Sequence, residues 1–273
     1  MRKREAALLP IAGHGEAAGA DNDPNMVTAL ARGLDVLRAF RRNDAQLGNL
    51  DLAQRTGLPK ATVSRLTYTL SRLGYLVYLP EAGKYRLGAG VLGLGFSYLG
   101  ATGIRDMARP LMQELADYAG VTVALGQRDG LSMVYVEVCR SSGVVHLTMD
   151  IGARIRIGTS AMGRAYIAAL APAERAPLLQ DIAAREPQSW PSVELGINQA
   201  RRDLAEYGFT MSMGEWQPDV NAVGVPVDGG GGALSFALNC GGPAYLLPRK
   251  KLLEDIGPRL AAIGARLRGM LGG

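Results

Sequence analysis

The sequence predicts an α+β protein of two domains, in which a small helical domain ends in a β-hairpin and a larger domain mixes strands with helices. Three observations lead to this prediction. The chain has 273 residues, enough for two ordinary domains. Helical periodicity fills residues 27–73, whereas β-branched runs alternate with helical segments from residue 121 onward. All of the net charge of +5 lies in residues 1–100, because the remainder carries seventeen basic and seventeen acidic residues.

Residues 1–25 are interpreted as a disordered N-terminal tail. Its short apolar stretch is interrupted by Pro10 and followed by His14, so it lacks the long apolar core of a secretory signal. The two cysteines, Cys139 and Cys240, argue against a disulfide framework and favour the cytoplasm. No stretch reaches the roughly 18 apolar residues of a membrane span, and no Cys/His cluster has metal-ligand spacing. We expect no membrane association, no metal and no cofactor.

Residues 26–87 are predicted to form the first domain. Apolar side chains recur every three or four positions between residues 27 and 40, which predicts a first helix. A second, short helix fits residues 48–56 and ends at Gly57. A third helix opens at Pro59, where the missing N–H costs nothing, and continues to about residue 73. Its expected inner face carries Val63, Leu66, Leu70 and Leu73.

Two short β-rich runs, residues 75–79 and 84–87, follow the third helix and are joined by a turn that contains Pro80 and Gly83. Two helices linked by a short glycine-containing turn and followed by a hairpin make a winged helix-turn-helix pattern. Residues 26–87 hold ten basic and four acidic residues, an excess that favours nucleic acid as the partner.

The third helix needs a polar face if it is to enter the major groove of DNA. Arg65 suits a bidentate contact to guanine or a contact to phosphate, and short hydroxyl side chains suit phosphates or base edges. The hairpin would place two further cations over the phosphates. The candidate DNA-binding residues are Lys60, Thr62, Ser64, Arg65, Thr67, Tyr68, Lys84 and Arg86.

Residues 88–103 are predicted to form a linker helix, because residues 88–100 are apolar and rich in glycine and should be buried against something. Residues 104–273 are predicted to form the second, α/β domain. Its expected helices are residues 104–118, 160–170, 172–184, 193–207 and 252–271. Its expected strands are residues 121–127, 133–139, 143–149, 220–227 and 233–239, with a turn at residues 229–232.

Several of these segments resemble the IclR-type transcriptional regulators. The first domain carries VTALARGL from residue 27 and LAQRTGLPKATVSRL from residue 52, then Gly74-Tyr75-Leu76 leading into the second hairpin strand. In the second domain, GTSAMGRA at residues 158–165 resembles the effector-domain loop and helix of that family. The run Tyr207-Gly208-Phe209 and the late strands to Pro243 resemble its closing strands. The resemblance covers roughly residues 26–271.

The resemblance implies a winged helix that binds double-stranded DNA, a linker helix and a GAF-like effector-binding domain around a curved sheet. It also implies a homodimer, often formed through the winged helices, and commonly a tetramer. In this family a small organic acid or aromatic molecule shifts the affinity for DNA. That shift is limited by the difference in the ligand's affinity for the two states of the protein.

The family's effector pocket lies between the loop before the first helix of the second domain and two late strands. The backbone N–H groups that begin such a helix suit a carboxylate, whatever the family. Ser212 stands where some members have an acidic residue, Ala222 where some have cysteine, and Asn239 and Gly241 where some have serine. These departures imply a roomier pocket with one amide. The residues carried over by position are Ala161, Met162, Val220, Ala222, Asn239, Gly241, Ser212 and Trp216.

Trp216 is either a lid of this pocket or a tryptophan packed in a surface loop.

The sequence also offers three alternatives to an effector-controlled regulator. Gly88, Gly90 and Gly93 match the glycine pattern of a dinucleotide-binding turn, which would make the chain an NAD-dependent oxidoreductase, but no parallel βαβ unit surrounds them. Ser160 lacks the complete nucleophile elbow of a hydrolase, and His146 precedes it. A DNA-binding protein without an effector is the third alternative. The sequence favours a regulator that is not an enzyme, and repression over activation.

Overall fold

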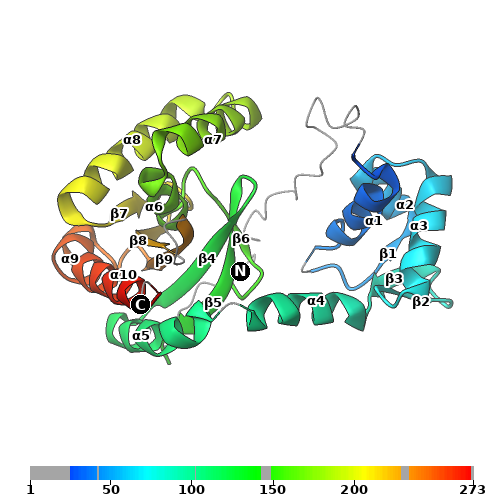
Figure 1. The fold of residues 1–273 in the computed structure, drawn as a ribbon, viewed down its shortest axis with the longest axis horizontal. Coiled ribbons are helices and arrows are strands. Elements are labelled where there is room, and N and C mark those ends of the chain that lie inside the picture. Colours follow the sequence, from blue (N-terminus) through cyan, green and yellow to red (C-terminus); the bar gives the residue numbers. More distant parts are fainter. Residues whose placement is uncertain (1–24, 42, 102, 143–148, 229–233, 272–273) are drawn as a thin grey trace. The chain divides into compact units, whose positions relative to one another are not determined.

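The computed structural model describes residues 25–41, 43–101, 103–142, 149–228 and 234–271 (Figure 1). They fall into two compact units, whose boundary lies between Ala101 and Thr102. Residues 1–24 of the expected tail, the strand expected at 143–149 apart from Met149, and the turn at 229–232 lie outside the described residues, as does His146. No helix of the described segments is long and apolar enough to span a membrane.

The first unit is a winged helix-turn-helix followed by one further helix. Its elements are α1 (Thr28–Arg38), β1 (Leu47–Gly48), α2 (Asn49–Thr56), α3 (Lys60–Arg72), β2 (Leu76–Leu79), β3 (Lys84–Leu87) and α4 (Ala89–Gly100). The three strands form an antiparallel sheet in the order β1-β3-β2. The two-residue strand β1 was not expected, because a run of two residues is too short to show alternation. Its pairing with β3 fixes the start of α2 against the wing.

Local chemistry explains the turn between α2 and α3. Gly57 adopts a left-handed conformation with φ 71°, which ends α2 as the sequence predicted, and Pro59 caps the start of α3. Leu73 was expected on the inner face but is 63% exposed. The helix ends at Arg72, so Leu73 belongs to the terminating turn and points away from the core. The core comprises Val36, Phe40, Leu47, Leu52, Val63 and Leu76.

The glycines at the start of α4 have a packing role. A Cβ atom on Gly88 would lie 2.3 Å from the carbonyl oxygen of Gly74, and one on Gly90 would lie 3.0 Å from the same atom. The N–H of Gly88 donates to Tyr75 O at 2.8 Å, and that of Gly90 to Gly74 O at 3.2 Å. The preceding strand β3 lies in an antiparallel sheet, so the setting of a dinucleotide-binding turn is missing here.

The second unit is built on a six-stranded antiparallel sheet in the order β6-β5-β4-β9-β8-β7. Its strands are β4 (Thr122–Asp129), β5 (Ser132–Arg140), β6 (Arg154–Arg156), β7 (Thr210–Met213), β8 (Val220–Asp228) and β9 (Leu234–Pro243). Its helices are α5 (Ile104–Ala119), α6 (Ala161–Ala169), α7 (Pro172–Arg185), α8 (Trp190–Tyr207), α9 (Arg249–Lys251), a π-helical turn (Leu252–Ile256) and α10 (Gly257–Leu271). The strands β6 and β7 were not expected from the sequence.

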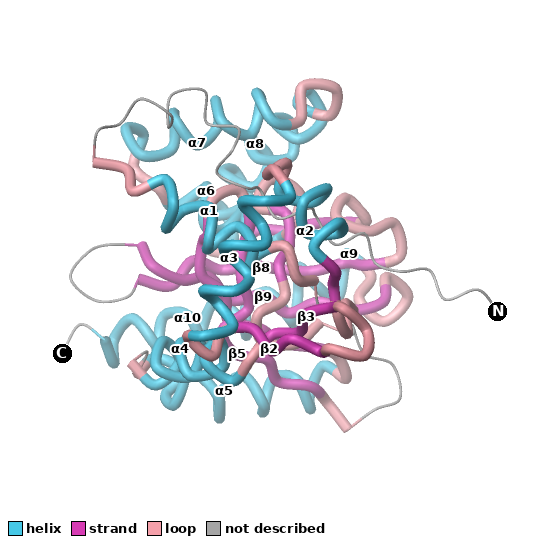
Figure 2. The backbone as a smooth tube through the Cα atoms, turned by 90° about the vertical axis from the view of Figure 1, so that its right-hand side faces the viewer, coloured by secondary structure: helices cyan, strands magenta, loops and turns pink. Residues whose placement is uncertain are grey.

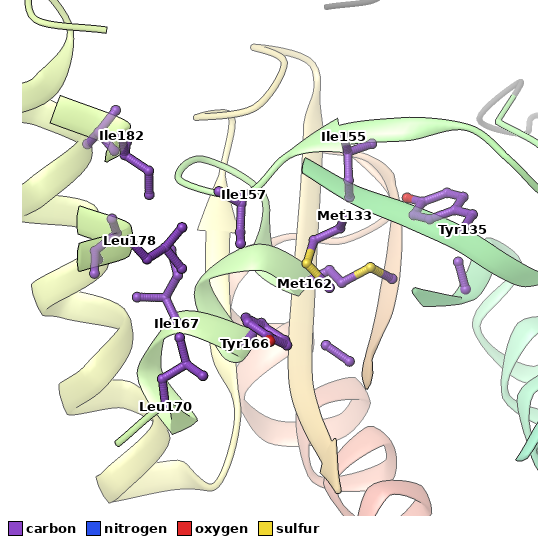
Figure 3. Close-up of a cluster of buried hydrophobic side chains, with 14 of the residues drawn as sticks. Met133, Tyr135, Ile155, Ile157, Met162, Tyr166, Ile167, Leu170, Leu178 and Ile182 are labelled. Carbon is purple, nitrogen blue, oxygen red and sulfur yellow. The ribbon is translucent and has the colours of Figure 1, made fainter. Parts of the chain in front are cut away.

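Helices cover both faces of this sheet, as Figures 1 and 2 show. Helix α6 packs on one face with α8 against it, and α5 and α10 pack on the opposite face. Between α6, α7, α8 and the sheet lies a continuous hydrophobic core that includes Met133, Met162, Ile167 and Leu178 (Figure 3). The start of α6 is therefore held rigidly against the middle of the sheet.

A β-bulge in β5 separates two functionally different side chains. Leu125 pairs with Glu137 and Gly126 pairs with Tyr135, which leaves Val136 as the extra residue. The bulge inverts the alternation of side chains. Tyr135 consequently belongs to the core on the α6 side. Glu137 is buried on the other side and accepts hydrogen bonds from two arginines of α5, Arg105 at 2.9 Å and Arg109 at 2.7 Å.

Candidate DNA-binding face and ligand pocket

The outer face of α3 presents a cation-rich surface to solvent. Lys60, Ser64 and Arg65 are exposed, Tyr68 is 67% exposed and Thr62 is half-buried. Ser64 and Arg65 lie four and three residues before Tyr68, so these three side chains share the side of α3 away from the core residue Val63, and Lys60 is exposed at the start of the helix. An exposed, unpacked helical face with positive charge has the chemistry needed to meet a phosphate backbone.

Thr67 does not belong to this face, which corrects the sequence prediction. Its side chain is completely buried, and its hydroxyl lies 3.0 Å from Val63 O and 3.3 Å from Asn49 Oδ1. Residues 63 and 67 are four apart and share the inner side of the helix. The amide of Asn49 also donates to Ser64 Oγ at 3.2 Å, so one α2 side chain holds both α3 residues. The sequence does not indicate this role for Asn49, because its contacts reach from α2 across the turn to α3.

The wing carries the two cations expected there. Arg86 is exposed and Lys84 half-buried, and being two residues apart on β3 they project to the same face. Arg55, by contrast, is engaged within the protein. It pairs with Asp44 and donates to Ala39 O at 2.8 Å. Its hydrogen bond to the Asp44 carboxylate lowers the pKa of Asp44, in spite of partial burial.

A pocket lies in the second unit where α6 begins, between the sheet and the loop after β7. The space between its walls is about 320 Å³, a figure that includes the part open to solvent. Seven of the eight expected residues line it, and none of its lining side chains carries a charge. The lining residues are Tyr135, Ile155, Ser160, Ala161, Ser212, Trp216, Val220, Ala222, Asn239 and Gly241.

Met162 is the expected pocket residue that the structure places elsewhere. Its side chain is completely buried in the core, and Figure 3 shows it extending from α6 toward Met133. A Cβ atom on Gly126 would lie 2.4 Å from its sulfur, so this glycine makes room for it. One step along a helix turns the side chain by about 100°, which takes residue 162 from the pocket into the core.

Three lining residues were not expected: Tyr135, Ile155 and Ser160. Ser160 is the N-cap of α6, where its hydroxyl accepts from the N–H of Gly163 at 3.1 Å and donates to Arg156 O at 2.6 Å. A serine before an apolar helix is a capping signal that would have found it. Tyr135 and Ile155 come from β5 and β6, whose approach to the pocket depends on the sheet order alone.

Two polar groups of the pocket remain open to a ligand. The N–H groups of Ala161 and Met162 at the start of α6 have no acceptor within the helix, whereas that of Gly163 donates to Ser160 Oγ. Asn239 is 7% exposed, and its Oδ1 has no hydrogen-bond partner among the described residues. Burial raises the pKa of Tyr135 to about 12, although a side-chain hydrogen bond with Asn239 opposes the rise, so the phenol is protonated at neutral pH. The Ser212 hydroxyl already donates to Thr159 O at 2.8 Å.

The loop that carries Trp216 is tied to α6 by a buried arginine. Arg164 is 3% exposed, donates through Nε to Gly158 O at 3.1 Å and pairs with Glu215. A Cβ atom on Gly196 of α8 would lie 1.9 Å from the guanidinium, so a side chain there would displace it. Trp216, next to Glu215, lines the pocket and packs against the core. It is thus a wall of the pocket.

No three His, Cys, Asp or Glu side chains in the described segments group so as to hold a metal ion.

The winged helix-turn-helix and the separate α/β domain place the chain in the class of DNA-binding transcriptional regulators. Two family profiles agree with this class. The IclR helix-turn-helix domain matches residues 29–80, and the C-terminal domain of the bacterial transcriptional regulator IclR matches residues 96–266. The chain belongs to the IclR family, whose members are regulators and not enzymes.

Known proteins resemble the chain over most of its length. The HTH-type transcriptional regulator TsaQ1/TsaQ2 of Comamonas testosteroni is 34% identical over 88% of this chain and 87% of its own. The crystal structure of an IclR family regulator from Brucella abortus has a TM-score of 0.85 with 46% identity, covering 93% of this chain and 96% of that one. An IclR homologue from Microbacterium hydrocarbonoxydans, solved with 4-hydroxybenzoate, shares the fold at 20% identity, covering 88% and 99%, with a TM-score of 0.67.

Proposed function

We propose that the chain is an operator-specific repressor whose affinity for DNA is modulated by a small organic acid bound in the pocket of the second unit. The observation that carries this proposal is a pocket without charged side chains that is lined by Ser160 and Ala161, where α6 begins. A carboxylate is the group to which the N–H groups of such a helix start donate most favourably. The 4-hydroxybenzoate complex of the Microbacterium homologue supports the choice of a small acid.

The DNA contacts in this proposal come from the exposed residues of α3 and the wing. Arg65 reads a base edge, Lys60 and Ser64 meet phosphates or bases with Thr62 and Tyr68 beside them, and Lys84 and Arg86 of the wing lie over phosphates. Repression is the direction proposed, because occupying the operator is sufficient to exclude the polymerase. Activation would need an additional surface that contacts it. The chain would act in the bacterial cytoplasm, where the DNA is.

A homodimer, and two dimers joined as a tetramer, complete the proposal. Helix α4 has no buried residue, although it is strongly apolar, and several apolar residues of α1 are exposed as well. A second copy would cover Leu30 and Leu34 of α1, Val27 just before it, and the α4 residues Leu92, Leu94, Phe96 and Tyr98. The linker helix was expected to be buried, and within its own unit it is not. A dimer would present two recognition helices to a symmetric operator.

The test is a titration of operator affinity against salt, followed by the Arg65→Ala variant. Neutralising several phosphates makes the affinity fall steeply with salt, and losing a base contact costs about 1–3 kcal/mol. Arg266→Ala, an exposed arginine of α10, is the matched control. An affinity that does not respond to salt would overturn DNA binding by this face. If no carboxylic acid changes the operator affinity, the effector part of the proposal fails and a DNA-binding protein without an effector remains.

A further inference from the structure

The contact between α2 and α3 contains a small polar network beside an apolar core. Asn49, the first residue of α2, places its amide between two residues of α3. Thr67 Oγ1 lies 3.3 Å from Asn49 Oδ1, and Ser64 Oγ lies 3.2 Å from Asn49 Nδ2. Thr67 is completely buried, Asn49 is half-buried and Ser64 is exposed. The network therefore leads from the core of the first unit to the outer face of α3.

The backbone on the N-terminal side of Asn49 is held in place by two contacts. The preceding residue, Gly48, pairs with Lys84 of β3, so it belongs to the small sheet that forms the wing. The N–H of Gly48 also donates to Asp51 Oδ2 at 2.9 Å, which closes the first turn of α2. The amide of Asn49 is thus presented to α3 from a fixed backbone.

The buried hydroxyl of Thr67 does not depend on Asn49. It lies 3.0 Å from Val63 O, the carbonyl four residues earlier, and this acceptor is nearer than Asn49 Oδ1. An apolar side chain at position 49 would therefore leave the Thr67 hydroxyl satisfied, and it would bury more apolar surface next to Val63. Stability by itself does not account for an amide at this position.

The nitrogen end of the amide holds the hydroxyl of Ser64. Hydroxyl side chains within a helix often donate to the carbonyl four residues earlier, as Thr69 does to Arg65 O at 3.0 Å. The Ser64 hydroxyl makes no such bond in the described part of the chain, where it takes part only in the bond from Asn49. Because its oxygen accepts from the amide, its proton remains available to an acceptor outside the protein.

We propose that Asn49 is a positioning residue for DNA binding, which holds the Ser64 hydroxyl so that it donates to an acceptor on DNA. This inference rests on the proposed function, because it takes the outer face of α3 as the DNA-binding face. The amide fixes the oxygen of Ser64 and, by donating to it, makes the hydroxyl a stronger donor. The acceptor is a phosphate oxygen or an acceptor atom of a base in the major groove.

The test is a double-mutant cycle of Asn49→Leu and Ser64→Ala in the full-length chain, at one fixed salt concentration. The probes are a duplex that the wild-type chain selects from a random-sequence library and a shuffled duplex of the same composition. Ser64→Ala should weaken binding of the selected duplex about 3- to 10-fold, the range for one lost hydrogen bond. Asn49→Leu should weaken it about threefold when Ser64 is present and less than about 1.5-fold in the Ser64→Ala chain, because it acts through Ser64.

Stability distinguishes a positioning role from a structural one. Asn49→Leu should leave the midpoint of urea unfolding, followed by far-UV circular dichroism, unchanged or raised, because leucine is apolar and similar in size. A structural amide would instead lose stability and affinity together. Asn49→Ala provides the same cycle if the leucine chain does not fold. Gln54→Leu, which removes an exposed amide of the same helix, is the matched control and should leave the affinity unchanged.

Two results would overturn the inference. One is an equal loss from Asn49→Leu with and without the Ser64 hydroxyl, and the other is an unchanged affinity of the Ser64→Ala chain. In either case, weaker binding by Arg65→Ala would leave the proposed function in place. A wild-type chain that enriches no sequence from the library would overturn the proposed function as well.

The two duplexes identify the acceptor. A loss that is equal for the selected and the shuffled duplex supports the proposal with a phosphate as the acceptor, since phosphates are common to all sequences. A loss confined to the selected duplex supports it with a base as the acceptor.

Discussion

The outer face of α3 and the pocket beside α6 treat polar groups in opposite ways. On α3 the side chains of Lys60 and Arg65 are exposed to water. In the pocket the polar groups of Tyr135, Ser212 and Asn239 are buried, uncharged and, apart from one oxygen, already satisfied by the protein. The first site attracts a large anion by its charge. The second would recognise a small molecule through hydrogen-bonding groups that have no partner within the protein.

The two sites therefore differ in how far function and stability can be separated. A substitution on the exposed face changes affinity and leaves the free energy of unfolding nearly unchanged, as is usual for surface residues. A substitution around the pocket alters packing and buried hydrogen bonds, so affinity and stability change together. The following experiments test this difference, beginning with the largest expected effect.

Gly224→Val should disrupt the pocket domain most. The new Cβ atom would lie 2.3 Å from Ala161 O and 2.9 Å from the amide nitrogen of Met162, so α6 would have to move. Overpacking of this kind lowers the free energy of unfolding by about 3 kcal/mol. Tryptophan fluorescence during urea unfolding reports on this unit alone, because the chain has two tryptophans, Trp190 and Trp216, and both lie in it. Gly269→Ala, with open space around it, should cost little, and an equal loss in both variants would contradict this account.

Thr67→Val distinguishes a buried polar residue of α3 from its exposed neighbours. The variant keeps the shape of the side chain and removes the hydroxyl that contacts Val63 O and Asn49 Oδ1. Losing these contacts should lower the free energy of unfolding by about 1–2 kcal/mol, as for other buried hydrogen bonds. Operator affinity should remain unchanged at temperatures where the chain is folded. Far-UV circular dichroism melting and a DNA-binding assay measure the two quantities.

Thr69→Val is the matched control, on the same helix but exposed. It should change neither quantity appreciably. If Thr67→Val instead weakened operator binding while leaving stability unchanged, Thr67 would belong to the DNA-binding face after all.

Glu215→Gln should loosen the wall of the pocket with a smaller effect on stability. The Glu215 side chain is 40% exposed, and a glutamine there can still accept a hydrogen bond from the buried Arg164, so the substitution should lower the free energy of unfolding by only about 1 kcal/mol. Trp216 should become more mobile, which fluorescence anisotropy measures, and ligand affinity should fall by up to about tenfold, the equivalent of 1.4 kcal/mol. Glu194→Gln, an exposed residue of α8, is the control. An unchanged anisotropy would show that the ion pair does not position Trp216.

Asp44 should give the smallest effect, visible as a dependence on pH. Its hydrogen bond with Arg55 lowers the pKa of the folded carboxyl below the unfolded value of about 3.9. The resulting stabilisation is therefore present above that value and disappears as the pH falls through the folded pKa. Because both side chains are partly exposed, it should be below about 1 kcal/mol. Asp44→Asn should remove this part of the difference in thermal stability between pH 7 and pH 3, whereas Glu81→Gln in the wing turn should not.

Recognition in the first domain was predictable because it depends on contacts that are close in the sequence. Gly57 and Pro59 fix the turn between two helices whose periodicity is plain, and the exposed side of α3 follows from that period. The error at Thr67 has the same origin. A threonine is compatible with either side, and its partner Asn49 lies across the turn, where periodicity carries no information.

The pocket was predictable only by position, through the family resemblance. Met162 lies in the core because it follows the pocket residue Ala161 by one position, and one position along a helix turns the side chain to another side. Tyr135 could not be found at all, because its place beside Asn239 needs the strand order, the small residues of β4 and the bulge at Val136 together.

The sequence by itself determined the order of the helices, the charge of the first domain and the helix start that suits an acid, since these rest on local periodicity, caps and composition. The tertiary structure alone decided which polar atoms are left unpaired. A hydrogen-bond partner can come from any strand that the sheet brings near, so the empty acceptor of Asn239 exists only once β5, β4 and β9 have paired.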